Sequence, residues 1–184
     1  MNSFVIISTV IVVLAIFAVS MYNRLVRLNI NVNEAFAQIE VQLKRRSDLI
    51  PNLVETVKGY AAHESATFEK VVAARAKATT ASGVADVAAA DGMVTQALRG
   101  LLAVAEAYPD LKASTNFLAL QEELSTTENK VSFARQYYND NVKSLNAAVK
   151  TIPTSLFAGM AKVNERVFYE VEDPQSRQAP TVKF

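Results

Sequence analysis

The residue pair in this chain that comes nearest to a catalytic motif is His63-Glu64. A zinc peptidase helix needs the pattern HExxH, because two imidazoles one turn apart hold the metal while the glutamate acts as base. Thr67 stands where the second histidine would be, and the chain has one histidine in all. We therefore expect His63 to be a surface or capping residue near a helix bend and not a metal ligand.

Other reactive side chains are equally scarce. The absence of cysteine excludes disulfides, thiolate catalysis and cysteine-bound metal. The five glycines form no GxGxxG or GxxxxGK loop that could cradle a phosphate, and no nucleophile elbow marks a serine. Nineteen Lys and Arg against eighteen Asp and Glu leave no basic excess for nucleic acid. We expect no enzyme activity, no cofactor, no metal and no nucleic-acid partner.

A charged run, Lys44-Arg45-Arg46-Ser47-Asp48, interrupts an apolar helical stripe between Leu43 and Ile50. At least one of its side chains must point inward, and helical spacing selects Arg46 or Ser47. A buried charge must be paired, since an unpaired one costs several kcal/mol. The plausible partners are Glu122, Glu123 and Glu128. The run is either a structural ion pair or a solvated face, or it is a basic surface, Lys44, Arg45 and Arg46, that meets a partner or anionic lipid headgroups.

The first 23 residues carry no charged side chain, and Phe4 to Met21 is an almost continuous apolar run. At about 1.5 Å per residue the run spans roughly 27 Å as a helix, close to the hydrocarbon core of a bilayer. Ala18-Val19-Ser20 would suit signal-peptide cleavage. However, no basic segment precedes the run, and the run is long for a signal peptide. We expect residues 1–23 to be a retained transmembrane anchor.

Arg24 and Arg27 follow the apolar run at once, and no Lys or Arg precedes it. The positive-inside rule then places the N-terminus outside and the remaining domain in the cytoplasm. The two arginines are also the best candidates for lipid contacts. Lys44 lies roughly 30 Å further along a straight helix, beyond the Debye length of about 8–10 Å.

The rest of the chain reads as all-α, with an apolar stripe that begins where the anchor ends. Because proline removes a backbone donor, Pro51 predicts a kink or restart within residues 46–50, with Ser47 as N-cap of a second segment. That segment should run on to about Ala78, and residues 79–83 should connect it to a third helix over Val84 to Ala107.

The fourth helix is the clearest, running for about 38 residues from a cap at Ser114 to Pro153. Adjacent positions on a helix face about 100° apart, so Tyr137 and Tyr138 cannot share one core layer, and one of them suits an interface. A short amphipathic helix follows Pro153. Residues 167–184 read as an extended tail that is either disordered or an arm packing on a neighbouring subunit, with Phe168 and Tyr169 as contact candidates.

Three stretches carry a resemblance: NEAFAQIEVQLKRRSDLIPNLVETVKGYAAHE (33–64), EAYPDLKAS (106–114) and NFLALQEELSTTENKVSFARQYYND (116–140). In this order they resemble the LemA family of bacterial membrane-anchored proteins. The resemblance implies a long antiparallel helical bundle on a single span of the inner membrane, with an anchor at 1–23, a cytoplasmic bundle at 24–166 and a tail at 167–184. It implies no catalytic residues. Some relatives belong to systems that build bacterial membrane organelles.

Three classes of function remain. The scarcity of reactive side chains and catalytic motifs disfavours an enzyme. The favoured hypothesis is a non-enzymatic scaffold that self-assembles as a homo-oligomer and organises the membrane or its proteins. The alternative is a monomeric or dimeric adaptor that recruits a membrane protease or signalling partner.

Overall fold

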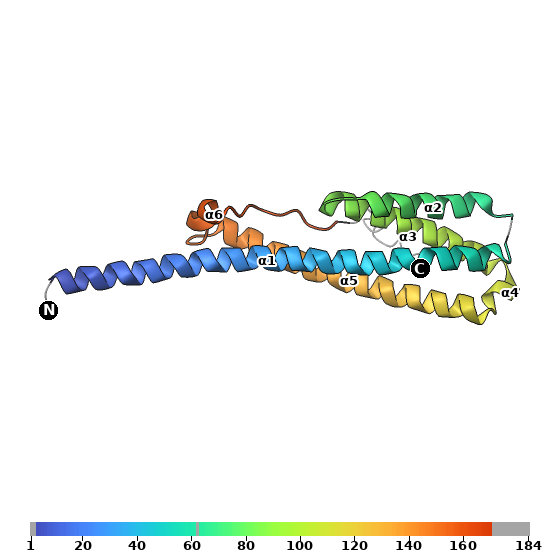
Figure 1. Cartoon of the computed structure of the whole chain (residues 1–184), viewed down its shortest axis with the longest axis horizontal. Coiled ribbons are helices and arrows are strands. Elements are labelled where there is room, and N and C mark those ends of the chain that lie inside the picture. Colours follow the sequence, from blue (N-terminus) through green and yellow to red (C-terminus); the bar gives the residue numbers. More distant parts are fainter. Residues whose placement is uncertain (1–2, 62, 171–184) are drawn as a thin grey trace, which may run out of the picture. The chain divides into compact units, whose positions relative to one another are not determined.

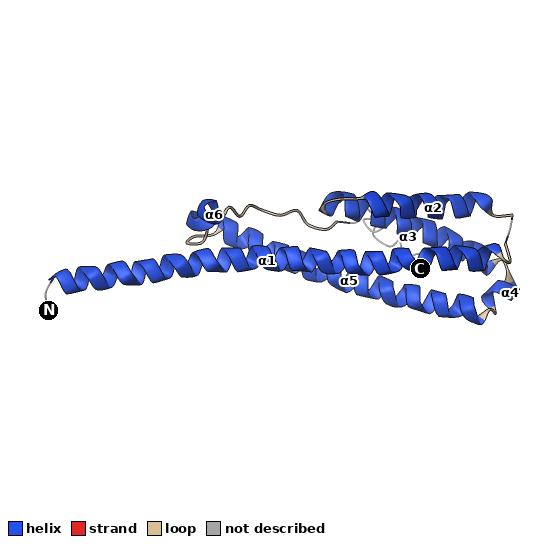
Figure 2. Cartoon of the chain, in the orientation of Figure 1, coloured by secondary structure: helices blue, strands red, loops and turns tan. Residues whose placement is uncertain are grey.

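The computed structural model describes residues 3–61 and 63–170, and within these ranges the chain is helical with connecting loops (Figures 1 and 2). The all-α prediction is confirmed. The helices are α1 (Ser3–Lys58), α2 (Ser65–Thr80), α3 (Val84–Glu106), α4 (Pro109–Lys112), α5 (Thr115–Lys150) and α6 (Ser155–Ala161).

Helix α1 runs without interruption from the apolar N-terminal run past Pro51 to Lys58. The predicted restart at Ser47 is therefore wrong. Proline cannot donate to the carbonyl four residues back, which is that of Ser47. Arg75 of α2 supplies the missing donor, because its Nε lies 3.0 Å from the Ser47 carbonyl oxygen. The chain leaves the helix later, in the turn that follows Lys58.

The later helices follow the sequence pattern closely. Helix α3 ends one residue before the predicted limit, and α5 spans 36 residues between Ser114 and Thr151. The short helix expected after Pro153 is α6. Gly83 precedes α3 with φ at 79°, in the range that favours glycine over residues with a side chain.

The chain divides into two compact units, which we describe separately. The first unit comprises residues 3–38 and 134–168 of the described chain, so it holds the N-terminal part of α1, the C-terminal part of α5, and α6. Near the end of the apolar run its core consists of Leu25, Ala148 and Ala158, with Leu28, Val149, Phe157 and Ala161 packed around them.

The second unit comprises residues 39–133 and, of the described C-terminal residues, Tyr169 and Glu170. It contains α2, α3 and α4 together with the adjoining parts of α1 and α5. Its core is formed by apolar side chains that all these helices contribute, among them Leu53, Val57, Phe68, Val71, Leu98, Leu101, Leu111 and Phe117. The limits expected between anchor, bundle and tail (1–23, 24–166, 167–184) stay a prediction.

Candidate functional site

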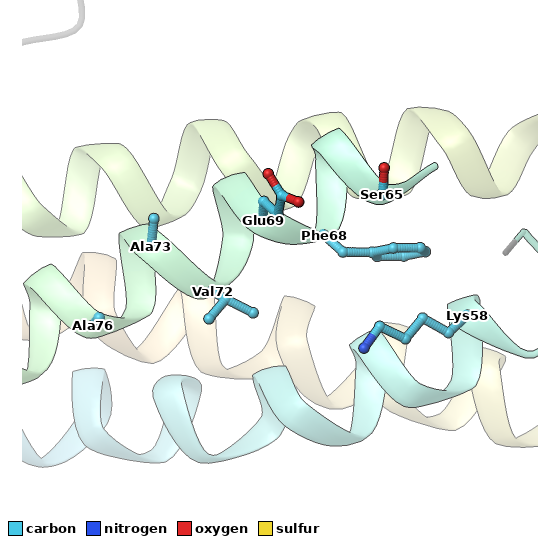
Figure 3. A pocket seen from close by; sticks show the side chains of 7 residues that line it. All are labelled: Lys58, Ser65, Phe68, Glu69, Val72, Ala73 and Ala76. Atoms are coloured by element: carbon cyan, nitrogen blue, oxygen red, sulfur yellow. The ribbon is translucent and has the colours of Figure 1, made fainter. Parts of the chain in front are cut away.

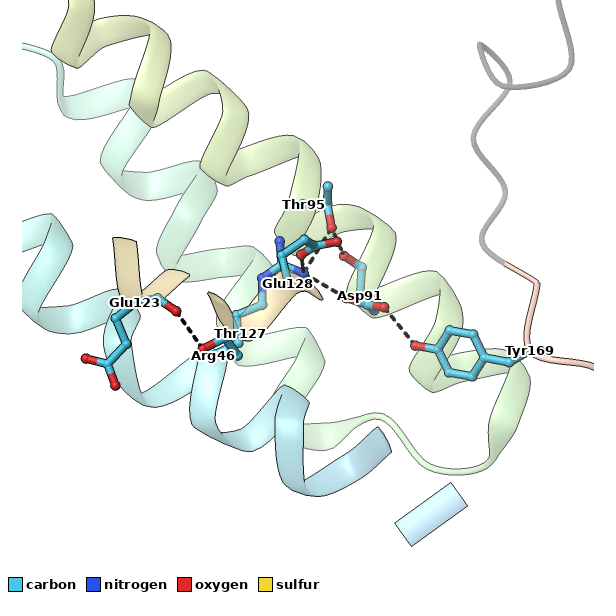
Figure 4. A network of polar contacts seen from close by, with 7 residues as sticks. All are labelled: Arg46, Asp91, Thr95, Glu123, Thr127, Glu128 and Tyr169. Atoms are coloured by element: carbon cyan, nitrogen blue, oxygen red, sulfur yellow. Dashed lines mark hydrogen bonds and ion pairs between the residues drawn. The ribbon is translucent and has the colours of Figure 1, made fainter. Parts of the chain in front are cut away.

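The second unit buries a cluster of charged and polar side chains around Arg46 (Figure 4). Arg46 on α1 is only 5% exposed, and its Nη1 lies 3.0 Å from Oδ1 of Asp91 and 3.1 Å from Oγ1 of Thr95, both on α3. The same nitrogen lies 2.8 Å from Oε2 of Glu128 on α5. One guanidinium therefore joins three helices.

Tyr169 closes the cluster from the C-terminal segment. Its hydroxyl donates to Oδ2 of Asp91 over 2.8 Å, while Arg46 holds Oδ1 of the same carboxylate. Thr127 lies beside the cluster on α5 and donates its hydroxyl to the Glu123 carbonyl oxygen over 2.7 Å. With both oxygens of Asp91 engaged and Arg46 enclosed, the arrangement is that of a structural ion-pair network.

This network tests the inference drawn from the charged run at 44–48. Of the two inward candidates, Arg46 and Ser47, it is Arg46 that is buried, and of the three expected partners Glu128 pairs with it. Glu123 instead pairs with the neighbouring Arg45, at 3.1 Å. No sequence pattern pointed to Asp91, because it lies in an alanine-rich helix with an apolar composition.

The basic surface expected at residues 44–46 is smaller than predicted, because Arg46 is buried and is wrong as a member of it. Lys44 and Arg45 are exposed. Lys44 pairs with Asp48 one turn along α1, and Arg45 reaches Glu123. Both remaining cations are thus partly neutralised on the surface of the second unit.

The two adjacent tyrosines of α5 separate as predicted, one inward and one outward. Tyr138 is 1% exposed, its ring centroid lies 5.8 Å from that of Phe36, and its hydroxyl donates to the Val167 carbonyl oxygen over 2.9 Å. Burial raises the pKa of the Tyr138 phenol, and the charge of Arg166 opposes that rise. Tyr138 is therefore wrong as an interface residue, whereas Tyr137 is 49% exposed.

The two aromatic residues of the expected tail differ as well. Phe168 is exposed and Tyr169 is buried. Because Tyr169 binds Asp91 of its own chain, it is wrong as a contact to a neighbouring subunit. The rest of the expected arm, residues 171–184, lies outside the described residues.

At the N-terminal end, α1 is long and apolar enough to cross a membrane, and none of its most apolar stretch is buried. A signal sequence at this position would have the same composition. Helix α3 is also long and apolar enough to cross a membrane, yet it contributes Leu98 and Leu101 to the core of the second unit. Arg24 and Arg27 are exposed directly after the apolar run.

Sequence reasoning missed a groove between the end of α1 and α2, with a volume of about 580 Å³ (Figure 3). Phe68 and Val72 supply its apolar surface, and Lys58 and Glu69 supply one charge of each sign. The Lys58 ammonium lies 5.9 Å from the centroid of the Phe68 ring, in reach of a cation–π contact. His63 lies exposed in the turn between the two helices, as expected of a surface residue.

Within residues 3–61 and 63–170 no group of three or more His, Cys, Asp and Glu side chains could hold a metal ion. What these residues define is a helical protein with an apolar N-terminal helix and a buried ion-pair network.

The sequence model of the LemA family matches residues 35–184, so the chain belongs to the LemA family. The chain is also similar to Protein LemA of Metamycoplasma hominis, with 28% identity over 139 residues. The matched region is 74% of this chain and 63% of that relative, so the chain spans less than two thirds of the relative's length.

Proposed function

We propose that this protein is a non-enzymatic scaffold, anchored by α1 in the bacterial inner membrane, that self-assembles and organises membrane-associated proteins. The observation that carries the proposal is the continuity of α1. One helix contains both the apolar run and the core positions Leu53 and Val57. Because α1 enters the lipid and also contributes to the core of the second unit, the helix attaches that unit to the membrane directly.

The exposure of the apolar run supports the anchor. Nothing in the described chain covers it, and a stretch of this length and composition in water would be a large apolar patch. Lipid is the solvent that matches it. Arg24 and Arg27 at its end support an N-terminus outside and the helical units in the cytoplasm.

The character of the polar groups supports a non-enzymatic role. The most deeply buried charges, Arg46 and Asp91, are paired with each other inside the second unit. Such a pair fixes which helices pack together and does not offer a free acid or base.

Exposed aromatic side chains on α5 support self-assembly. Phe133 is 72% exposed, and Tyr137 follows it by four positions, which places both on one face of the helix. Aromatic residues are enriched in protein interfaces. The sequence pattern indicated Tyr137 or Tyr138 as an interface residue and did not indicate Phe133, although Phe133 lies four positions before Tyr137.

Light scattering of the full-length chain in nanodiscs or mild detergent tests the scaffold. We expect a defined particle of many subunits, which Phe133→Ser with Tyr137→Ser should break into smaller species. Leu118→Ser, at another exposed apolar position of α5, is the matched control and should leave the mass unchanged. A monomer or dimer would reject self-assembly. Mass spectrometry of the membrane-extracted chain should find residues 1–23 retained, since a signal sequence would have been removed.

The groove between α1 and α2 favours a second candidate, a monomeric or dimeric adaptor that recruits a membrane protease or signalling protein. Its apolar floor and single charge of each sign suit a short amphipathic segment of a partner. A small particle that gains mass only with such a partner, and fails to do so after Val72→Glu, would favour the adaptor over the scaffold.

A further inference from the structure

In the first unit, α6 presents a second apolar surface beside the end of the membrane-spanning run. Ile152 is 80% exposed, and Leu156 and Met160 are each 72% exposed. Leu156 and Met160 are four positions apart within α6, so they share one face of that helix, and Ile152 is exposed in the turn that precedes it. We call Ile152, Leu156 and Met160 the α6 apolar edge.

The opposite side of α6 is fixed against α1. Ala158 packs with Leu25 and Ala148 in the core of the first unit, and Phe157 and Leu28 pack against this group. Ala158 lies two positions from both Leu156 and Met160, which on a helix is close to the opposite face. The α6 apolar edge therefore points away from the protein core.

The contacts of α6 with Leu25 and Leu28 also determine which part of α1 lies beside α6. Leu25 and Leu28 follow Met21, the last residue of the apolar run, by one to two helical turns. In Figure 1, α6 lies beside α1 at that level, where α5 ends. On a membrane anchored by α1, this level is the boundary between hydrocarbon and headgroups.

The local structure keeps α6 in this position. The buried hydroxyl of Thr154, directly before α6, donates to the carbonyl oxygens of Ala148 and of Thr151, the latter over 2.9 Å. At the other end, the Val163 amide reaches back to the Ala158 carbonyl oxygen over 3.1 Å, and the Val163 side chain is buried. Both ends of α6 are thus tied down, so its exposed side chains have a fixed direction.

The charges around the α6 apolar edge are mostly positive, and Glu165 is the anion among them. Residues 3–33 and 147–164 contain no Asp or Glu but four cations, Arg24, Arg27, Lys150 and Lys162. Lys150 is paired with Glu165 at 2.7 Å, and the other three are exposed. A surface with apolar side chains and flanking cations matches the anionic headgroup region of a bilayer.

We infer that α6 is a second membrane contact, in which Ile152, Leu156 and Met160 enter the interface of the bilayer that α1 spans, and Arg24, Arg27 and Lys162 bind anionic headgroups. The inference rests on the proposed anchoring by α1. It adds that the protein touches the membrane at two places, which fixes the rotation of the first unit about the axis of α1.

Site-directed tryptophan quenching tests the inference, because the natural chain has no tryptophan. The full-length variant Leu156→Trp is reconstituted in vesicles of phosphatidylcholine and phosphatidylglycerol with brominated acyl chains. Leu14→Trp, within the apolar run, is the membrane reference. Tyr137→Trp, at an exposed position about 20 Å before the end of α5, is the control outside the membrane.

We expect Leu156→Trp to be quenched by the brominated lipid, with less quenching in vesicles of phosphatidylcholine alone, and Tyr137→Trp to remain unquenched. Ile152→Trp should likewise be quenched, and less so when Leu156→Ser and Met160→Ser remove its apolar neighbours. Because tryptophan is placed at two positions, 152 and 156, the test remains valid if one of the substitutions disturbs α6.

Quenching of Leu14→Trp without quenching at positions 152 and 156 would overturn the inference and leave the anchor standing. No quenching at any position would reject the anchor itself. A blue shift at position 156 that depends on protein concentration, without quenching by lipid, would show that a second copy of the chain covers the α6 apolar edge, which also overturns the inference.

Discussion

Arg75 Nε on α2 donates to the carbonyl oxygen of Ser47 on α1 over 3.0 Å. That oxygen is the helix acceptor which Pro51, four residues later, cannot serve. The side chain of one helix thus completes the backbone of another, and the defect caused by Pro51 becomes the point at which α2 is attached. The bond explains why α1 passes through a proline without ending.

This bond predicts an interaction energy between positions 51 and 75. In the natural chain Arg75→Leu should lower the free energy of unfolding by about 1.5–3 kcal/mol, because a charge-assisted hydrogen bond is lost. After Pro51→Ala, the backbone amide of residue 51 can serve the Ser47 carbonyl, so the same Arg75 change should cost less. Denaturant unfolding of the four variants measures the difference.

The matched control for this cycle is Arg99→Leu, at an exposed position of α3. Arg99→Leu should change the free energy of unfolding only slightly, and by the same amount whether residue 51 is Pro or Ala. If Arg75→Leu proves equally costly in both backgrounds, the Ser47 bond does not compensate for the proline.

Arg46 and Arg45 are neighbours with opposite environments, and their removal should have unequal effects. Arg46→Met leaves the buried carboxylate of Asp91 without its cation, which should cost about 3–5 kcal/mol. Arg45→Met breaks an exposed pair with Glu123 and should cost at most about 1 kcal/mol. Urea denaturation followed by circular dichroism compares the two. Equal costs would contradict the buried network.

Tyr169→Phe removes only the hydroxyl that binds Asp91. The loss of a buried hydrogen bond to a charged group should lower the free energy of unfolding by about 1.5–3 kcal/mol. Limited proteolysis should also cut near residue 169 sooner than in the natural protein. Tyr137→Phe, which removes an exposed hydroxyl from α5, is the control and should change neither quantity.

Tyr138 predicts a loss of stability at high pH. Its pKa is raised above the ordinary 10.0 mainly by burial, so the unfolded chain releases this proton at a lower pH than the folded chain does. Stability from this group is complete below about pH 10 and falls as the pH rises through the folded pKa. Tyr138→Phe should remove that part of the alkaline decline.

The same substitution should cost about 1 kcal/mol at neutral pH, since the hydrogen bond to the Val167 carbonyl is lost. Thermal melts between pH 7 and pH 11 give both effects, with Tyr137→Phe as the exposed control. An alkaline decline of equal slope in Tyr138→Phe would show that another group causes it.

Sequence periodicity predicted the helices wherever packing and local signals agree. Val131, Tyr138 and Leu145 of the α5 stripe are buried. The helix begins directly after the expected cap Ser114 and ends at Lys150, shortly before Pro153. Helical spacing also narrowed the inward position of the charged run to Arg46 or Ser47, and the structure buries Arg46.

The errors arose where a tertiary contact overrides a local signal. Pro51 predicts a helix end from its own chemistry, but the donor that prevents it is Arg75, on another helix. The actual turn after Lys58 was hidden because Val57, Ala61 and Phe68 continue the apolar pattern across it. Asp91 and Tyr169 lie 78 positions apart, and no local pattern reports a contact of that separation.

The position of Tyr169 has a consequence for the order in which the protein is made. The other members of the network, Arg46, Asp91 and Glu128, leave the ribosome before it. The Asp91 carboxylate receives the tyrosine hydroxyl only after a further 78 residues have been synthesised. A nascent or truncated chain that stops short of this residue carries an incomplete network and is the less stable species. Proteases that sample unfolded states can therefore distinguish it from the chain with a complete network.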